Sequence, residues 1–385
     1  MVYYTKRYVP ENKQVTWVDV LLNFDDAKLF KENTNNRTTT RKYENVPKNL
    51  SGLLVLKEIV RTLKAFNERH ADLFEAERSS LYRSYKIRKR SGGLRQIDEP
   101  LPSLKDAHSE LKDILSTFGI FHHASAYAYI EKRCTVDCLK VHRNFGSEYY
   151  LKTDLSDFFG STTEEFVQNQ VKMIFPFSEI CKYTAKDTDG SILDGKAELF
   201  KALSLCFLNG GLPQGTTISP FLTNLIMIPI DFELSNKLSE RKLVYTRYAD
   251  DMLISGVEKF PWKTIVALIE NEFKQFAAPY HIKDEKTRFG SRRGSNFNLG
   301  LCTNAQNQIT VGHKAKKIFK AMLNSYILDT RNKKDWPLDD VQHMSGLLSY
   351  YMSIEPVYFT DMINRYNEKY SVDFKKMLKK SLSIQ

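Results

Sequence analysis

Three aspartates in this sequence have the side chains and the spacing to hold metal ions. Asp250 and Asp251 are adjacent within Val-Tyr-Thr-Arg-Tyr-Ala-Asp-Asp-Met-Leu-Ile-Ser-Gly, residues 244–256, and Asp154 closes the short run Tyr-Tyr-Leu-Lys-Thr-Asp. Adjacent carboxylates repel each other, and burying either one without a partner is costly. A surface turn would avoid this cost. A bound divalent cation, which prefers hard oxygen ligands, would offset it.

The elements around the acids decide whether they can meet. Apolar residues predict strands over 243–248 and 252–256, so the turn between them carries both carboxylates off one end of a sheet. Asp154 ends a predicted strand over 149–154, which lies 96 residues earlier (250 minus 154). The three acids therefore converge only if these strands are neighbours in one sheet. Two Mg²⁺ ions held about 4 Å apart there would stabilise the attacking and leaving oxygens of a phosphoryl displacement.

Helical periodicity accounts for much of the remaining chain. It predicts helices over 53–74, 103–118 and 265–276, and a further helix that starts near Pro220 and runs to about Leu238. Beyond residue 312 the chain is helical and basic, and we expect 365–380 to form one basic amphipathic helix.

Turn residues mark the hairpins and loops. A β-hairpin is expected over 84–98 around Ser-Gly-Gly, and another over 298–311. The stretch 183–195 is expected to be a polar loop. The first 50 residues are polar and irregular, with 33–41 as an exposed loop.

The composition favours a packed protein with a polyanionic partner. The 385 residues are 42% hydrophobic and 12% aromatic, which excludes wholesale disorder, and the net charge is +11. A basic surplus points to nucleic acid first. No apolar run reaches the length of a membrane span and the N-terminus lacks a secretory signal, so the expectation is a cytoplasmic protein with no membrane partner. The 5 cysteines fit a reducing compartment.

Cys134, Cys138 and His142 follow one another at helical spacing and invite comparison with a zinc site. Zinc sites usually have a fourth ligand and closer cysteines. Packing along one helix face is therefore the favoured interpretation.

Several motifs together resemble the palm of reverse transcriptases. They are Tyr-Ala-Asp-Asp (248–251), Leu-Pro-Gln-Gly (212–215) and the segment from Asp154 to Phe159. The resemblance covers roughly residues 80–370 and extends to retron reverse transcriptases and their relatives in antiphage defence.

This resemblance implies an α+β, right-hand polymerase fold, mostly helical outside the palm, with an antiparallel palm sheet. The expected division is an N-terminal extension (1–75), fingers (76–150), a palm (151–312, with a fingers segment at about 160–215) and a helical basic thumb (313–385).

The resemblance also implies site residues. Asp154, Asp250 and Asp251 would bind two Mg²⁺ ions, and Lys286 would protonate the leaving pyrophosphate, with Lys283 as its rival. Residues expected to bind the nucleotide are Arg88 (or Lys89), Arg95, Leu155, Phe159, Gln214 and Gly215. Among them, Phe159 would be a steric gate that leaves no room for a 2′-hydroxyl, and Arg95 would hold phosphate with its planar fork.

Two segments depart from the retron pattern. Cys138-Leu-Lys-Val-His142 stands where retron enzymes carry Asn-Ala-x-x-His, and Asn298-Leu-Gly300 stands where they carry Val-Thr-Gly. These departures favour another defence-associated lineage.

The expected function is an RNA-directed DNA polymerase that makes cDNA from a non-coding RNA in antiviral defence. Its partners would be the RNA template, the DNA product, dNTPs, and either a second defence protein or further copies of the chain. The alternatives are a retron-type enzyme making branched RNA–DNA, a catalytically silent RNA-binding scaffold, an untemplated polymerase, and an RNA-dependent RNA polymerase.

Overall fold

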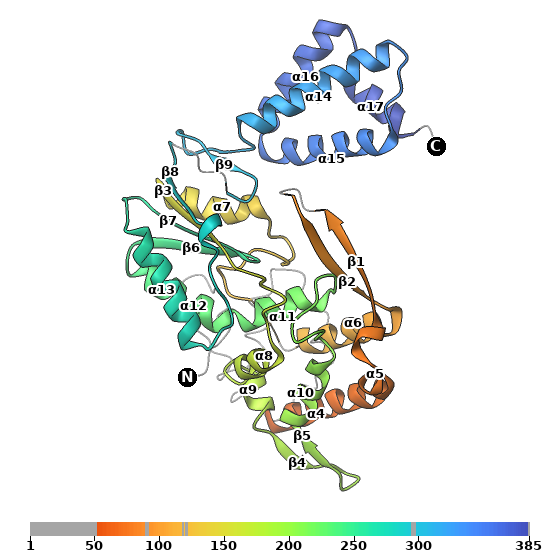
Figure 1. Cartoon of the computed structure of the whole chain (residues 1–385), viewed down its shortest axis with the longest axis vertical. Helices are drawn as coiled ribbons and strands as arrows, with labels where there is room; N and C mark the ends of the chain where they lie inside the picture. The colour runs from red at the N-terminus through yellow and green to blue at the C-terminus, as the bar shows by residue number, and fades with distance from the viewer. Residues whose placement is uncertain (1–51, 89–91, 118, 120–121, 294–297, 384–385) are drawn as a thin grey trace. The chain divides into compact units, whose positions relative to one another are not determined.

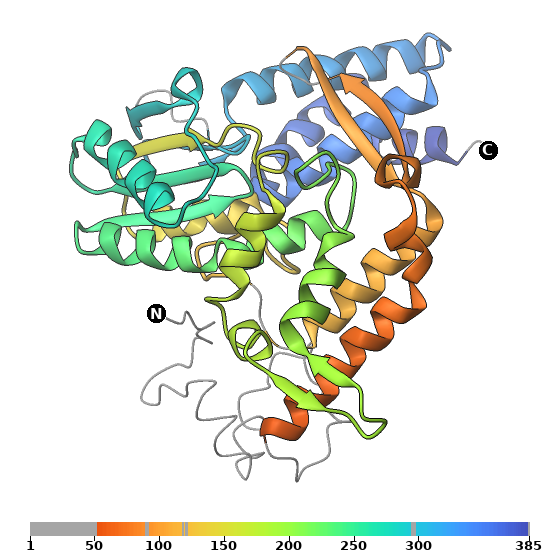
Figure 2. The same ribbon diagram turned by 60° about the horizontal axis from the view of Figure 1, so that its bottom comes forward.

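The computed structural model describes residues 52–88, 92–117, 119, 122–293 and 298–383. The predicted loop at 33–41 and most of the proposed N-terminal extension lie outside these residues. The described residues form two compact units, each assembled from several segments: those within 52–131, 153–252 and 261–287 belong to the first, and those within 132–152, 253–260 and 288–383 to the second. Figures 1 and 2 trace the chain from two sides.

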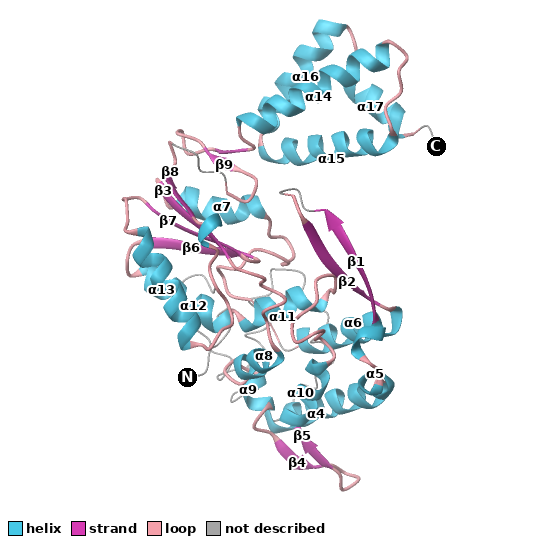
Figure 3. Ribbon diagram, in the orientation of Figure 1, coloured by secondary structure: helices cyan, strands magenta, loops and turns pink. Residues whose placement is uncertain are grey.

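A four-stranded sheet carries the predicted acidic residues (Figure 3). Its order is β6-β7-β3-β8. The strands are β6 (Leu243–Tyr248), β7 (Asp251–Gly256), β3 (Tyr149–Asp154) and β8 (Arg288–Ser291). The strands expected at 149–154, 243–248 and 252–256 are thus confirmed, β7 beginning one residue earlier. Most residues of these three strands are buried, which explains why their sequences are rich in apolar residues.

Three further sheets have two strands each and share no strand with this sheet. They are formed by β1 (Tyr82–Arg88) with β2 (Leu94–Pro100), β4 (Thr184–Lys186) with β5 (Ile192–Asp194), and β9 (Cys302–Thr303) with β10 (Ile309–Thr310). The first and third confirm the predicted hairpins. The second corrects the expectation of a polar loop over 183–195.

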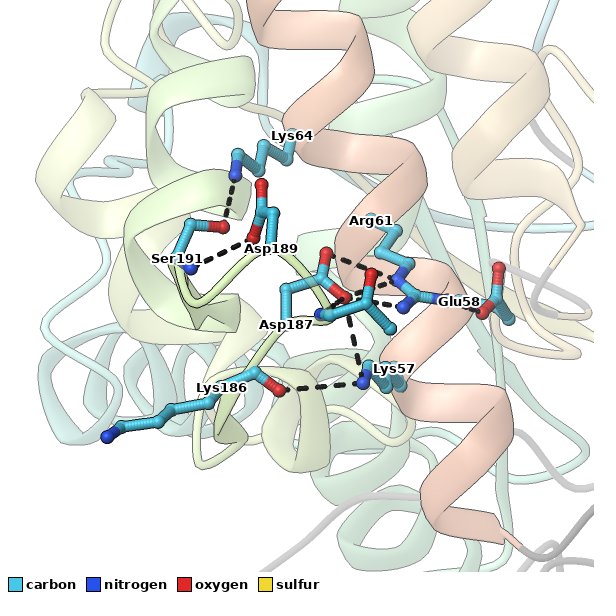
Figure 4. A network of polar contacts seen from close by, with 9 residues as sticks. Lys57, Glu58, Arg61, Lys64, Lys186, Asp187, Asp189 and Ser191 are labelled. Carbon is cyan, nitrogen blue, oxygen red and sulfur yellow. Dashed lines mark hydrogen bonds and ion pairs between the residues drawn. The ribbon is translucent and has the colours of Figure 1, made fainter.

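The β4–β5 hairpin is held by contacts with residues that are far away in the sequence (Figure 4). Arg61 of α4 (Gly52–Arg69) donates from Nε to Asp187 Oδ1 at 3.0 Å, and Lys64 donates to Ser191 Oγ at 2.8 Å. The Arg61 guanidinium holds the pKa of the Asp187 carboxyl well below its usual range. Because these partners lie more than a hundred residues from the hairpin, local sequence does not reveal it.

Helices make up most of the rest of the chain. In the first unit they are α4, α5 (Ala71–Glu75), α6 (Pro102–Ser116), α8 (Glu164–Val171), α9 (Phe177–Ile180), α10 (Gly195–Ser204), α11 (Ile218–Ile226), α12 (Ile228–Ser239) and α13 (Trp262–Gln275). In the second they are α7 (Thr135–Asn144), α14 (His313–Arg331), α15 (Leu338–Ile354), α16 (Pro356–Tyr370) and α17 (Phe374–Leu382).

Three predicted helices are each divided in two. The helix expected over 53–74 breaks at His70, and the helix expected from Pro220 to Leu238 breaks at Met227. The basic tail expected as one helix over 365–380 breaks after α16, where Ser371 adopts a left-handed φ of 51°. Asp373 then caps α17 by accepting a hydrogen bond from the Lys376 amide.

The helices α14–α17 share a core with the strands and loops of their own unit. Its fully buried members include Phe319, Leu323, Met344, Phe359 and Phe374. Throughout the described part of the chain, no helix combines the length and apolarity required to cross a bilayer.

Candidate active site

The ends of β3 and β7 bring Asp154 and Asp250 together. The Glu148 amide donates to the Gly256 carbonyl at 2.9 Å, and the Leu155 amide donates to the Asp250 carbonyl at 3.0 Å. This pairing shows that β3 and β7 are antiparallel. The end of β3 therefore lies beside the turn that precedes β7. The two strand ends that carry acids 96 residues apart (250 minus 154) therefore meet, as predicted.

The electrostatics of the site favour a bound cation. Burial raises the pKa of the Asp250 carboxyl, and the negative charges of Asp154 and Asp251 raise it further. The Asp154 side chain is only 9% exposed and accepts hydrogen bonds from Lys283 Nζ at 3.0 Å and Lys286 Nζ at 2.9 Å. Its hydrogen bond to Asp154 raises the pKa of Lys286. Two ammonium groups thus supply positive charge to this cluster.

The residues fit a divalent cation, although they form no closed cluster. Among the described residues, no three His, Cys, Asp or Glu side chains converge as a ready-made metal site. Lys283 and Lys286 hydrogen-bond to the carboxylate oxygens of Asp154. The donors are nevertheless all hard oxygens. A cation would also relieve the repulsion that raises the pKa of Asp250.

The two adjacent phenylalanines after Asp154 have different environments. Phe158 is 3% exposed and packs on the buried ring of Tyr280, with ring centroids 5.1 Å apart. Phe159 is half-buried, and the ring of Tyr129 approaches it edge-on at 6.3 Å. Phe158 therefore belongs to the core, while Phe159 is accessible.

The Leu-Pro-Gln-Gly loop is held between two neighbours. The Asp98 amide of β2 donates to the Gln214 carbonyl at 2.7 Å, and the Leu212 amide donates to the Phe159 carbonyl at 3.0 Å. Gly215 has a φ of +130°, and a Cβ there would lie 2.8 Å from the Asp98 carbonyl oxygen. Only glycine permits this approach.

The basic residues of the first hairpin lie on two faces. Arg95 pairs with Ile87 across the hairpin, whereas Arg88 pairs with Leu94. Because neighbouring side chains of a strand alternate, Arg88 and Arg95 point to opposite faces. The register therefore does not bring both arginines to one phosphate, and Lys89 lies outside the described residues.

Leu155 contributes to the site through its main chain. Its side chain is fully buried, its amide binds Asp250, and its carbonyl accepts from Lys283 Nζ at 3.3 Å. The predicted binding of a nucleotide by Leu155 stays a prediction, and with a buried side chain it would involve the main chain.

The sequence analysis did not predict a buried ion pair beside the turn that carries Asp250 and Asp251, the acid turn. Arg247 and Asp231 have no exposed side-chain surface, and Arg247 Nη1 donates to the Ala249 carbonyl at 3.3 Å. The signal was present as an arginine inside an apolar strand, a position that requires a buried partner.

The segment with Cys134, Cys138 and His142 packs as a helix. Cys138 and His142 are buried, whereas Cys134 is exposed. His142 Nδ1 lies 2.5 Å from Ser255 Oγ, and burial lowers the pKa of His142 to about 3. The packing interpretation is therefore confirmed for Cys138 and His142, whereas Cys134 is the exposed N-cap residue of α7.

An α+β fold with acids at the ends of the central strands of an antiparallel sheet is typical of a nucleic-acid polymerase palm. The chain belongs to the reverse transcriptase family: residues 87–320 match the family described as "Reverse transcriptase (RNA-dependent DNA polymerase)". This membership confirms the predicted right-hand polymerase class and its activity as an RNA-directed DNA polymerase.

Known relatives agree with this family. The chain is 27% identical over 319 residues to the Retron Ec83 reverse transcriptase of Escherichia coli, covering 79% of this chain and 93% of the relative. It is 27% identical over 292 residues to the Retron Ec73 reverse transcriptase of the same species, covering 74% and 86%. Among solved structures, a truncated apo telomerase from Candida tropicalis aligns with a TM-score of 0.42 at 13% identity, over 61% of this chain and 55% of that one.

Proposed function

We propose that this reverse transcriptase copies a non-coding RNA into cDNA, with Asp154, Asp250 and Asp251 holding two Mg²⁺ ions. The observation that supports this most is the hydrogen bond from the Leu155 amide to the Asp250 carbonyl, which joins the two acid-bearing strand ends. When bound, the ions would activate the primer 3′-hydroxyl and stabilise charge on the leaving pyrophosphate.

The lysines beside Asp154 have separate roles in this proposal. The side chain of Lys283 is 27% exposed and also donates to the Leu155 carbonyl, so it holds the strand end. The side chain of Lys286 is 52% exposed and binds only carboxylate oxygens of Asp154 in this structure. Lys286 is the more exposed of the two lysines and is our choice for the proton donor.

The nucleotide would be held by groups from three segments. Arg95 would bind the triphosphate, and Gln214 with Gly215 would line the base and sugar. The half-buried ring of Phe159 would exclude the 2′-hydroxyl of a ribonucleotide, because it fills that space and offers no hydrogen-bond partner.

For the biological setting, we propose a cytoplasmic role in antiviral defence with a dedicated non-coding RNA. The relatives named retron reverse transcriptases favour an RNA partner encoded for the enzyme. A retron-type branched RNA–DNA product is the second candidate, favoured by the same relatives. Sequencing the RNA that copurifies with the chain, together with any DNA joined to it, separates the two.

Primer extension on an RNA template tests the reaction itself. Asp250→Ala combined with Asp251→Ala should lower dNTP incorporation more than about a hundredfold, since the cation ligands are gone. The matched control is the exposed adjacent pair at the start of α15, Asp339→Ala with Asp340→Ala, which should retain activity. Equal activity of the Asp250/Asp251 double variant and the wild type would refute the metal site. RNA binding without any incorporation by the wild type would instead favour the scaffold.

A further inference from the structure

Tyr129 has an unusual backbone and an unusual exposure for a large aromatic residue. Its φ is +61°, in the left-handed region, and 59% of its surface is exposed. A bulky non-glycine residue rarely adopts this conformation and keeps it only where its surroundings enforce it. Such strain is concentrated at functional sites.

Hydrogen bonds on the segment before Tyr129 enforce its position. The Arg247 amide donates to the Ser125 carbonyl at 2.7 Å, and the Tyr127 amide donates to the Arg247 carbonyl at 2.8 Å. Asn224 Nδ2 donates to the Ala128 carbonyl at 2.9 Å. The segment is thereby fastened to β6 and α11, and the backbone of Tyr129 follows from it.

The ring of Tyr129 lies among the predicted nucleotide-binding groups. It meets Phe159 edge-on, with centroids 6.3 Å apart and an interplanar angle of 64°. Desolvation raises the pKa of the Tyr129 phenol, the charge of Asp250 raises it further, and the charge of Arg95 lowers it. The ring therefore contacts the predicted gate residue, and the charges of Asp250 and Arg95 act on its phenol.

We propose that Tyr129 is a second specificity-determining aromatic, which together with Phe159 forms a two-ring wall against the sugar of the incoming nucleotide. The proposal rests on the proposed function. An edge-on neighbour limits how far the ring of Phe159 can turn aside, and a gate that cannot turn discriminates more strongly against a 2′-hydroxyl. The bulk of the Tyr129 ring, and not its hydroxyl, carries this role.

Tyr129→Gly is the variant that tests the proposal. Glycine adopts a φ of +61° without strain, so the variant should fold at least as well as the wild type while lacking the ring. Single-nucleotide incorporation on an RNA template gives kcat/KM for a dNTP and for the matching ribonucleotide. We expect Tyr129→Gly to lower the dNTP preference about tenfold, Tyr129→Phe to change it less than about twofold, and the control Tyr350→Ala in α15 to leave it unchanged.

Combining variants separates a shared wall from independent effects. In the background of Phe159→Ala, Tyr129→Gly should lower the dNTP preference no further, because the ring it supports is already absent. An unchanged preference in Tyr129→Gly, or an equal loss in Tyr129→Phe, would overturn the proposal. Both results presuppose dNTP incorporation by the wild type; its absence would overturn the proposed function and, with it, this inference.

Discussion

Arg247 and Asp231 form an ion pair that is fully buried directly beneath the acid turn. Arg247 Nη2 lies 2.7 Å from Asp231 Oδ2, and both side chains have 0% exposure. The Tyr245 hydroxyl donates to the other oxygen of Asp231 at 2.7 Å. Because Arg247 also binds the carbonyl of Ala249, this pair connects α12 to the residue that immediately precedes Asp250.

Breaking this pair from one side should be strongly destabilising. Asp231→Ala would leave a guanidinium buried without its counter-charge, a change that typically lowers the free energy of unfolding by about 3–5 kcal/mol. Chemical denaturation measures the loss. The control, Glu179→Ala, removes the acid of an exposed pair with Lys182 and should change stability by less than about 1 kcal/mol. Similar values for the two variants would show that the buried pair is not a support of the turn.

Replacing Gly215 of the Leu-Pro-Gln-Gly loop should impair catalysis. In Gly215→Ala the new Cβ would meet the Asp98 carbonyl at 2.8 Å, at a φ of +130° that alanine rarely adopts. The loop must then move away from β2, and we expect kcat/KM for dNTPs to fall about tenfold or more. Gly346→Ala in α15 is the control, since its Cβ would meet nothing within 4 Å. Helix propensity favours alanine there by about 0.4–1 kcal/mol. Wild-type kinetics in Gly215→Ala would mean that activity does not require contact between the loop and the β1–β2 hairpin.

Substitutions of Lys286 and Lys283 should have different effects on kcat and on stability. If Lys286 donates the proton, Lys286→Ala should lower kcat about a hundredfold, with a small change in KM and the loss of one limb of the pH–rate profile. Lys283→Ala should lower kcat less and should lower the thermal midpoint more, because Lys283 binds both Asp154 and the Leu155 carbonyl. The reverse pattern would assign the donor to Lys283.

Asp250 should make the metal-free protein less stable at neutral pH. Its pKa is raised in the folded state by burial and by Asp154 and Asp251. An acid of this kind contributes stability that is fully present below its unfolded pKa and is lost as the pH rises through its folded pKa. In EDTA, Asp250→Asn should therefore have a higher thermal midpoint than the wild type at pH 7, and the difference should shrink toward pH 4.

A divalent cation should reverse this order. The wild type gains stability from ions that bind only the folded state, whereas Asp250→Asn should gain little. Differential scanning fluorimetry with and without Mg²⁺ measures both effects. A higher midpoint for the wild type in EDTA at pH 7 would contradict the repulsion inferred for this turn.

Local patterns predicted the elements that carry the site, but not all of their contacts. The strands over 149–154 and 243–248 and the first hairpin follow from apolar runs and turn residues that are visible within a few positions. The β4–β5 hairpin depends on Arg61 and Asp187, 126 residues apart, and no local pattern indicates it.

Two features around the predicted site also depend on contacts that the local sequence does not show. The sequence places Arg88 and Arg95 seven residues apart, but only the pairing register shows that they point to opposite faces. The segment before Tyr129 has no periodicity, and hydrogen bonds to Arg247 fix its position. Residues whose place depends on distant partners are the ones that sequence alone leaves out.

Asp154 should share bound cations with Asp250 and Asp251, and the number of bound Mn²⁺ ions measures this. Electron paramagnetic resonance of the chain with primer, RNA template and a dNTP reports how many Mn²⁺ ions are bound. We expect two ions per chain in the wild type and in the Asp339→Asn/Asp340→Asn control, and at least one fewer in both Asp154→Asn and Asp250→Asn. Unchanged Mn²⁺ binding in Asp154→Asn would refute the proposed metal site, since the ions would then be held elsewhere.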